Sequence, residues 1–277
     1  MRLMLIGLAV LLAAAGYDDP PAEEGKPTGD ALRNYYAKTA ARYEFFHDAA
    51  KTQRLKLVEK PVMTWTNDGD WSGDVFVWMR EDRPEMIGCP LTGPTQSKDE
   101  RIAFQEFHLL SERPIAPADM LGQLRWAPKE GLKRIALEGA PDPAETPALR
   151  LAQMRQLVRD FSAQMHADSL WELRLLPQPL MRYQPKEGPV IDGALFTYVW
   201  TKGTDPEMIL LLECRKSADG LAWFYAPVRF TYRELWLKYR DKEVWHGPFH
   251  HDPPAESDMI YTTHYLDRIV DPRLEAK

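Results

Sequence analysis

The chain has 277 residues, of which 44% are hydrophobic and 27% are charged, a composition that is typical of globular proteins and excludes a globally disordered chain. Its formal net charge is −6, and the sequence has no block of basic residues. Nucleic acids and anionic membrane surfaces are therefore excluded as electrostatic partners, because both are bound through clustered positive charge. The length allows one large domain or two small ones.

The first residues, MRLMLIGLAVLLAAAG, have the three parts of a secretory signal peptide. Arg2 is a short positive region, Leu3 to Ala15 is an apolar run, and the last alanines are small enough for cleavage. The run is shorter than the ~20 residues of a membrane span, although an uncleaved anchor is the alternative. Tyr17 stands where a lipoprotein requires cysteine. We predict a signal peptide over residues 1–16 and an exported protein, periplasmic, in the cell envelope or secreted, whose mature chain has no transmembrane span.

Residues 17–30 are rich in proline, glycine and acidic residues and predict a flexible linker. Two segments farther along the chain have apolar residues at helical spacing. Asp30 is a suitable cap for the first predicted helix, and the pair Thr146-Pro147 is a suitable start for the second. The apolar faces consist of Leu32, Tyr36, Tyr43 and Phe46 in the first helix and of Leu151, Met154, Val158, Phe161 and Met165 in the second.

Short β-branched or aromatic segments follow each helix and are separated by turn-forming residues. Such short connections join antiparallel neighbours, because parallel strands need a crossover. We therefore predict an α+β fold with two similar helix-plus-antiparallel-sheet units at residues 31–137 and 148–245, joined by a connector at 138–147. The two units have either separate sheets or one extended sheet. The predicted strands are KPVMTW, DVFVWM, EMIGCPL, IAFQEFHLL, PLMRYQ, ALFTYVW, EMILLLECR, AWFYAPVRFTY, LWLKY and EVW.

The tetrapeptide Pro-Glu-Met-Ile occurs twice, at residues 84–87 and 206–209. Its flanks also match, since LKLVEKPVMTW resembles ELRLLPQPLMRY, and Gly73 and Gly193 hold equivalent positions. The separation between matched residues grows slightly at each loop, as insertions in turns would produce. We predict an internal repeat in which each proline makes a hairpin corner and Met-Ile begins the next strand. The second copy continues with more apolar residues, so we expect it to be the longer, more buried strand and the first copy to be an edge.

The repeated carboxylates, Glu85 and Glu207, are candidates for acid–base catalysis, because paired carboxylates can exchange protons with a substrate. Each of them follows a proline and precedes an apolar strand, which is typical of the exit from a turn. We therefore expect a structural role at the turn and predict no catalytic residue.

The C-terminal segment, residues 246–277, is rich in proline and histidine and is predicted to be a tail. Its cluster HGPFHHDPPAESD contains the candidate metal ligands His246, His250, His251 and Asp252, since imidazole and carboxylate bind Zn²⁺ and similar ions. No HExxH motif is present, and a solvated surface loop is the alternative that we favour. We predict no cofactor.

Cys89 and Cys214 are the two cysteines of the chain. In an oxidising compartment they could form a disulfide, and two buried free thiols are the alternative. The sequence leaves the choice open, because a disulfide depends on the separation of the two Cα atoms.

Several segments together resemble an uncharacterised family of exported proteins typical of planctomycete bacteria. The segments are PVMTWTN, GDVFVWMREDRPEMIGC, FQEFHLLS, RWAPKEG and the stretch from ELRLLPQPLMRY to DGALFTYVWTKGTDPEMILLLECR, and the likeness covers about residues 40–245. Relatives often continue the Trp-Thr-Asn step with proline, whereas Asp68 follows Asn67 here. The family has no assigned activity, cofactor or catalytic residue, so the resemblance implies export and no chemistry.

No nucleophile elbow, phosphate-binding loop, dinucleotide fingerprint or CxxC motif is present in the sequence. The aromatic strands DVFVWM and LFTYVW could line a groove for a carbohydrate or peptide, although packing in the core explains the same residues with fewer assumptions. We expect a non-enzymatic exported protein that binds a protein or carbohydrate ligand or has a structural role in the envelope. The alternative is an exported hydrolase or metal-binding enzyme with its site between the two units.

Overall fold

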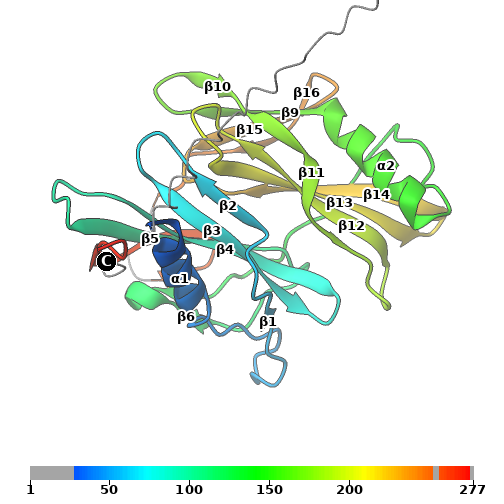
Figure 1. Ribbon diagram of the computed structural model, residues 1–277. Coiled ribbons are helices and arrows are strands. Elements are labelled where there is room, and N and C mark those ends of the chain that lie inside the picture. The colour runs from blue at the N-terminus through cyan, green and yellow to red at the C-terminus, as the bar shows by residue number, and fades with distance from the viewer. Residues whose placement is uncertain (1–27, 252–255, 275–277) are drawn as a thin grey trace, which may run out of the picture.

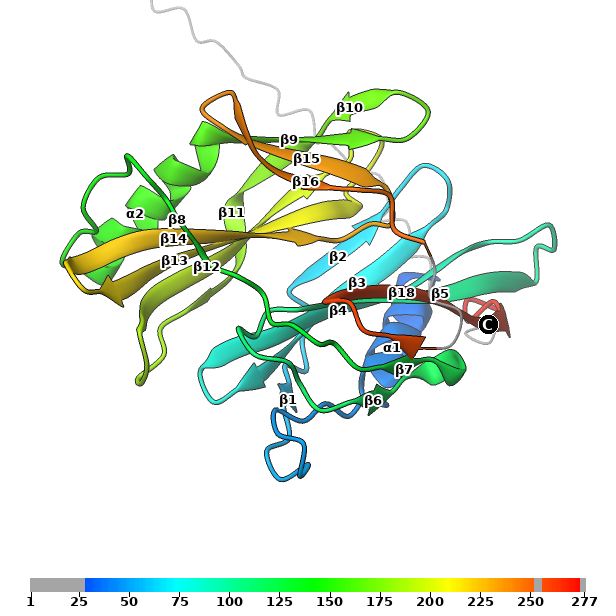
Figure 2. The same ribbon diagram turned by 180° about the vertical axis from the view of Figure 1, so that it is seen from behind.

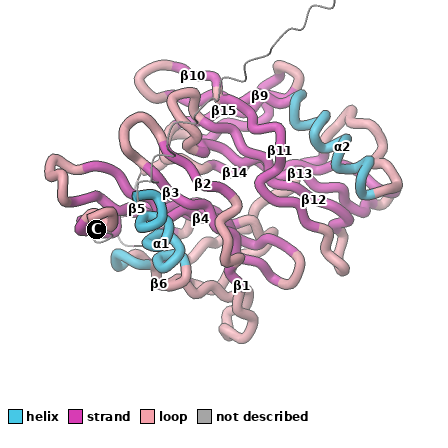
Figure 3. Tube along the Cα trace, viewed as in Figure 1, coloured by secondary structure: helices cyan, strands magenta, loops and turns pink. Residues whose placement is uncertain are grey.

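The computed structural model describes residues 28–251 and 256–274, so the predicted signal peptide and most of the predicted linker lie outside the described residues. The described part is an α+β structure in which antiparallel sheets predominate, as the sequence predicts. Figure 1 shows two large sheets, each with one helix against it, and Figure 3 shows how little of the chain is helical. None of the described helices is long and apolar enough to cross a membrane.

The first large sheet has six strands in the order β1-β3-β4-β5-β18, with β2 also paired to β3. Five of them come from the N-terminal half, whereas β18 comes from the C-terminal segment and pairs with β5 as an edge strand. Figure 2 shows β18 beside β5 from behind. The strands are β1 (Lys56–Leu57), β2 (Met63–Thr66), β3 (Ser72–Arg80), β4 (Arg83–Pro94), β5 (Glu100–Leu109) and β18 (Tyr261–Val270).

The second large sheet has the order β11-β12-β13-β14-β8. Its edge strand β8 precedes the predicted connector, so the N-terminal half contributes a strand to this sheet as well. Adjacent strands are antiparallel throughout. The strands are β8 (Ile135–Ala136), β11 (Arg174–Tyr183), β12 (Val190–Val199), β13 (Pro206–Ser217) and β14 (Gly220–Arg229).

Two smaller sheets complete the described part. One has the order β10-β9-β15-β16, and the other has the order β17-β7-β6 with a parallel pair between β17 and β7. The first consists of β9 (Phe161–His166), β10 (Leu170–Glu172), β15 (Glu234–Tyr239) and β16 (Lys242–Gly247), and the second of β6 (Ala118–Asp119), β7 (Arg125–Trp126) and β17 (Glu256–Ser257). The segment predicted to be a tail therefore supplies two strands.

The helices are α1 (Thr28–Ala40) and α2 (Pro147–Leu157), and two short 3-10 turns lie at Leu121–Gln123 and Val158–Asp160. The predicted start of α2 is confirmed, because the side chain of Thr146 accepts a hydrogen bond from the backbone N–H of Leu149 at 3.4 Å and Pro147 begins the helix. The predicted helix runs too far, however. Residues 161–166 form strand β9, which pairs with β15 about seventy residues later.

The core has three parts, two between a helix and its sheet and one between the two sheets. Tyr36 of α1 packs on Phe76 and Trp78, whereas Met154 of α2 packs on Phe196 and Tyr198. The opposite faces of the sheets contact each other through a central cluster of Val75, Val77, Ile87 and Cys89 with Leu195, Ile209, Leu211, Ala226 and Val228. The two sheets are thus separate and packed face to face, so of the two alternatives that the sequence left open, separate sheets are found and one extended sheet is not.

The expectation that the first Pro-Glu-Met-Ile strand is a shorter edge is also wrong. The strands β4 and β13 both have 12 residues, and each lies in the middle of its sheet. The turn before β4 consists of residues 81 and 82, and Pro84 already pairs with Met79 inside the hairpin. Pro206 likewise pairs with Val199. The two prolines therefore lie inside strands β4 and β13, and the hairpin turns precede the prolines.

Candidate functional site

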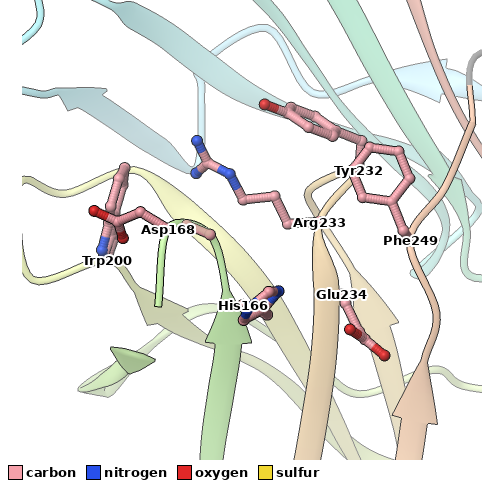
Figure 4. A pocket seen from close by; sticks show the side chains of 8 residues that line it. His166, Asp168, Trp200, Tyr232, Arg233, Glu234 and Phe249 are labelled. Carbon is pink, nitrogen blue, oxygen red and sulfur yellow. The ribbon is translucent and has the colours of Figure 1, made fainter. Parts of the chain in front are cut away.

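A concave site lies where the four-stranded sheet meets the ends of the second large sheet. It has a volume of about 650 Å³ and is lined by His166, Ala167, Asp168, Trp200, Tyr232, Arg233, Glu234 and Phe249. These residues come from the end of β9, the end of β12, the start of β15 and the segment after β16. Figure 4 shows their side chains around one shared space, with Arg233 reaching across it toward Trp200. We refer to this space as the Arg233 pocket.

Exposed aromatic rings form one wall of the Arg233 pocket. Tyr232 is 44% exposed and Phe249 is 50% exposed, and their ring centroids lie 5.6 Å apart in an edge-to-face arrangement. Trp200 lines the opposite side, and outside the pocket its ring lies 5.9 Å from that of Trp171, with the ammonium of Lys202 within 5.0 Å of both ring centroids. Large aromatic side chains normally bury their rings, so two exposed rings at a hollow indicate a binding surface.

The guanidinium of Arg233 has few partners among the described residues. Its Nη1 atom lies 3.7 Å from Oε1 of Glu207, which is longer than a hydrogen bond, and 4.0 Å from Sδ of Met165. The cation lies 4.8 Å from the ring centroid of Trp200 and 5.4 Å from that of Tyr232. Cation–π contacts hold the group in place, and none of its N–H donors has an oxygen partner at hydrogen-bonding distance among the described residues.

Two buried carboxyl groups stand behind Arg233. Glu207 is 2% exposed, and burial raises its pKa to about 7 against the opposing effect of Arg233. Burial, followed by the nearby Glu207 carboxylate, also raises the pKa of Asp205 well above its usual range. Near neutral pH, Glu207 is therefore only partly ionised and Asp205 favours its neutral form, which leaves part of the positive charge of Arg233 uncompensated.

The polar rim of the Arg233 pocket consists of side chains that already have one partner each. Asp168 accepts a hydrogen bond from Nε1 of Trp171 at 2.7 Å. Glu234 lies 2.8 Å from Nε2 of His246 and is the register partner of His166 across β9 and β15. Each carboxylate keeps lone pairs that can accept hydrogen bonds from a ligand.

A second, smaller hollow of about 170 Å³ lies between α1 and the β2–β3 hairpin. Its polar side chains contact one another: Nη1 of Arg33 lies 2.8 Å from Asp74, and the hydroxyl of Tyr36 is shared with Ser72 and Thr92 at 2.8 and 2.7 Å. Because these groups satisfy each other, the hollow offers few donors or acceptors to a ligand.

The candidate metal ligands of the C-terminal segment have different neighbours. His246 bonds to Glu234 and stacks on Trp236, whereas His250 is buried with its ring 4.9 Å from that of Tyr261. His251 packs on Phe249, and Asp252 lies outside the described residues. Within residues 28–251 and 256–274, no three His, Cys, Asp or Glu side chains come together as a metal site would require.

Cys89 and Cys214 are both buried and free in the structure. Cys89 belongs to the cluster between the two sheets, where Nε1 of Trp65 donates to its Sγ at 3.3 Å. Cys214 belongs to the cluster under α2, on the opposite face of the second sheet. The two thiols therefore lie in different parts of the core.

Glu85 and Glu207 are buried inside strands rather than exposed at turns, which corrects the sequence-based expectation. Glu85 is 1% exposed, and its Oε1 accepts a hydrogen bond from Nε of Arg80 at 3.3 Å. Only Glu207 lies behind the Arg233 pocket, next to Arg233. Neither Arg233 nor His166 belongs to a recognisable motif of the sequence. The segment Tyr232-Arg233-Glu234 between two apolar strands is the local signal that could have drawn attention to them.

Comparisons of the chain with protein-family models, curated proteins and solved structures find no match.

Proposed function

We propose that this chain is an exported, non-enzymatic binding protein whose Arg233 pocket holds a saccharide. The observation that carries the proposal is an open hollow of about 650 Å³ that is lined by two exposed aromatic rings and by the polar side chains of Asp168, Arg233 and Glu234. Aromatic rings pack on the C–H faces of sugars, and planar charged groups bond to their hydroxyls. One or two sugar rings match the volume, since ligand sites commonly measure ~300–1,000 Å³.

Calorimetric titration with a panel of neutral and acidic mono- and oligosaccharides tests this proposal. We expect the variants Tyr232→Ala and Phe249→Ala to weaken binding about ten-fold each, because each removes an exposed ring from the wall. Tyr265→Ala is the matched control, since Tyr265 is 41% exposed and lies on β18 away from the pocket. Absence of binding to every saccharide, or equal loss in all three variants, would overturn the proposal.

Export is supported by the signal-like N-terminus and by the resemblance to an exported family. Fractionation of cells that produce the full chain, followed by N-terminal sequencing of the mature protein, tests it. The expected product begins near Tyr17 and lies outside the cytoplasm. Full-length chain in the cytoplasm would contradict export without bearing on saccharide binding.

We also propose that the two large sheets derive from one duplicated unit. The support is their equal register: Trp65 pairs with Gly73 as Tyr183 pairs with Gly193, and the Met-Ile pairs face the same positions of the preceding strand. In both units a helix covers the face opposite the central cluster. An experimental structure with the two registers offset by one residue would contradict the duplication, because such a slip exchanges the faces.

A hydrolase is the second candidate, favoured by the raised pKa of Glu207, since a general acid needs a pKa near the working pH. Glu207 does not line the pocket, however, and Arg233 stands between its carboxyl group and the open space. Binding is therefore the better-supported proposal. Release of reducing ends from a bound oligosaccharide, abolished in Glu207→Gln, would favour the hydrolase instead.

A further inference from the structure

We infer that the ligand of the Arg233 pocket is an acidic saccharide whose carboxylate binds the guanidinium of Arg233. This inference rests on the proposed saccharide binding and goes further by naming the charge of the sugar and the residue that recognises it. Its basis is a positioned arginine at a hollow without an oxygen partner at hydrogen-bonding distance among the described residues.

The contrast with the neighbouring Arg229 shows that Arg233 is unusual. Arg229 is buried, and its guanidinium donates to the carbonyl oxygens of Thr231, Arg233 and Pro248 at 3.1, 2.8 and 2.6 Å. These three hydrogen bonds satisfy the guanidinium of Arg229 within the fold, so Arg229 has a structural role. The bond to the carbonyl oxygen of Arg233 also fixes the backbone of that residue. The side chain of Arg233 is instead 25% exposed and borders the pocket. A fixed backbone with free side-chain donors is the arrangement that binds an external oxyanion.

The aromatic neighbours of Arg233 restrict its orientation. The rings of Trp200 and Tyr232 both lie within 5.4 Å of the guanidinium carbon. Contacts with aromatic faces use the plane of a guanidinium, so its edge, which carries the N–H donors, stays available. A carboxylate can bond to that edge through both oxygens, with little loss of side-chain entropy because Arg233 is already held.

The charges around the pocket favour a carboxylate over a phosphate. Among the residues that line it, Arg233 supplies positive charge, whereas Asp168 and Glu234 on the rim supply negative charge. The single charge of Arg233 matches that of a carboxylate, whereas a doubly charged phosphate would keep one uncompensated charge beside the rim carboxylates. The rim carboxylates, which already accept from Trp171 and His246, can also accept from sugar hydroxyls.

The carboxyl group of Glu207 competes with the ligand for Arg233. Glu207 on β13 faces Arg233 and Thr231 before β15, Asp205 in the turn before β13, and the more distant Glu106 on β5. When Glu207 ionises, its charge pairs with Arg233 and opposes an anionic ligand. Since burial raises the pKa of Glu207 to about 7, ligand affinity should fall as the pH rises through neutrality.

The experiment compares three hexuronic acids, glucuronate, galacturonate and mannuronate, each with its methyl ester, its neutral hexose and the hexose 6-phosphate, by calorimetric or NMR titration of the full mature chain. The ester keeps the shape of the sugar and removes its charge. We expect at least one acid to bind ten-fold or more tightly than its ester, and Arg233→Met to remove that preference. Arg240→Met is the matched control, because Arg240 also lies over a tyrosine ring, at 4.9 Å, but bonds to Asp160 outside the pocket.

The pH dependence provides a second readout that a merely structural role of Arg233 would not change. Between about pH 6 and pH 8, affinity for the acid should fall several-fold in the wild type and stay nearly constant in Glu207→Gln, while affinity for the ester stays constant in both. Thermal unfolding of each variant checks that it is folded.

Four outcomes are decisive. Equal binding of acid and ester would refute the acidic ligand and leave saccharide binding intact. A preference for the acid that survives in Arg233→Met would refute the role of Arg233. Binding of a hexose phosphate more tightly than every uronate would refute the carboxylate, and absence of all binding would refute both this inference and the proposed function.

Discussion

Tyr183 occupies the space that a side chain at Gly193 would need. The two residues are register partners on β11 and β12, and a Cβ atom at position 193 would lie 2.7 Å from the hydroxyl oxygen of Tyr183. That hydroxyl donates to Oε1 of Glu213 at 2.7 Å on the next strand. The first sheet has the same packing arrangement, since a Cβ atom at Gly73 would lie 2.9 Å from Nε1 of Trp65. In both sheets the glycine leaves room for an aromatic side chain to cross the strand that contains the glycine. The aromatic side chain then bonds to a residue on the strand beyond, Glu213 in one sheet and Cys89 in the other.

We predict that Gly193→Ala lowers the free energy of unfolding by about 1–3 kcal/mol, because the methyl group pushes Tyr183 away from Glu213. Urea unfolding measures the change. Gly29→Ala is the matched control, since Gly29 lies exposed in the first turn of α1 with no atom within 4 Å of an added Cβ. Equal stability of the two variants would contradict the tight contact.

A buried ion network around Glu213 links the two halves of the molecule. Glu213 accepts from Nε of Arg134 and Nη1 of Arg215, each at 2.9 Å, and the other end of Arg215 bonds to Glu112 at 3.0 Å. Glu112 also pairs with Arg83 on β4 of the first sheet. We predict that Glu213→Gln destabilises the protein by about 3–5 kcal/mol, because it removes the buried counter-charge of Arg134 and one of the two carboxylates that pair with Arg215.

Chemical unfolding also measures this second change. Glu130→Gln is the control, because Glu130 forms an exposed pair with Lys133 at 3.5 Å and should cost less than about 1 kcal/mol. A loss of similar size in both variants would mean that the network does not hold the sheets together.

Glu112 should make the protein sensitive to acid. Burial opposes its ionisation, yet hydrogen bonds from Arg215 and Arg83 outweigh burial and lower its pKa to about 2. Because the folded pKa lies below that of the unfolded chain, the contribution of Glu112 is complete above about pH 4.5 and is lost as the pH falls toward 2. We predict a falling Tm over this range by calorimetry, with a smaller decrease in Glu112→Gln. A parallel decrease in that variant would assign the acid sensitivity to other carboxylates.

Both thiols should be inert in the folded protein. Burial, followed by the charge of Glu106, raises the pKa of Cys89 well above its usual range, and burial raises that of Cys214 to about 11. We predict no reaction with a thiol reagent at neutral pH in the native state and reaction of both cysteines after unfolding without reductant. If the unfolded, unreduced protein showed no free thiol, the cysteines would be paired.

The sequence by itself determined the α+β class, the start of α2 and nearly every long strand. These features are local, since Thr146-Pro147 satisfies the first turn of a helix and runs such as EMILLLECR favour strands through their own side chains. The segment at Phe161 shows the limit of local patterns. Its apolar spacing fits a helix, but pairing with β15 makes it a strand.

Only the tertiary structure decided where the charged residues lie. Glu207 follows a proline in a turn-like segment, yet it is buried because Arg233, Thr231 and two packed sheets surround it. The Arg233 pocket likewise combines four chain segments between His166 and Phe249, and no local pattern records their proximity. Burial and charge pairing depend on contacts between residues distant in sequence, whereas propensity and periodicity depend on neighbours. The sequence therefore determined the strands, and the packing of those strands determined the site.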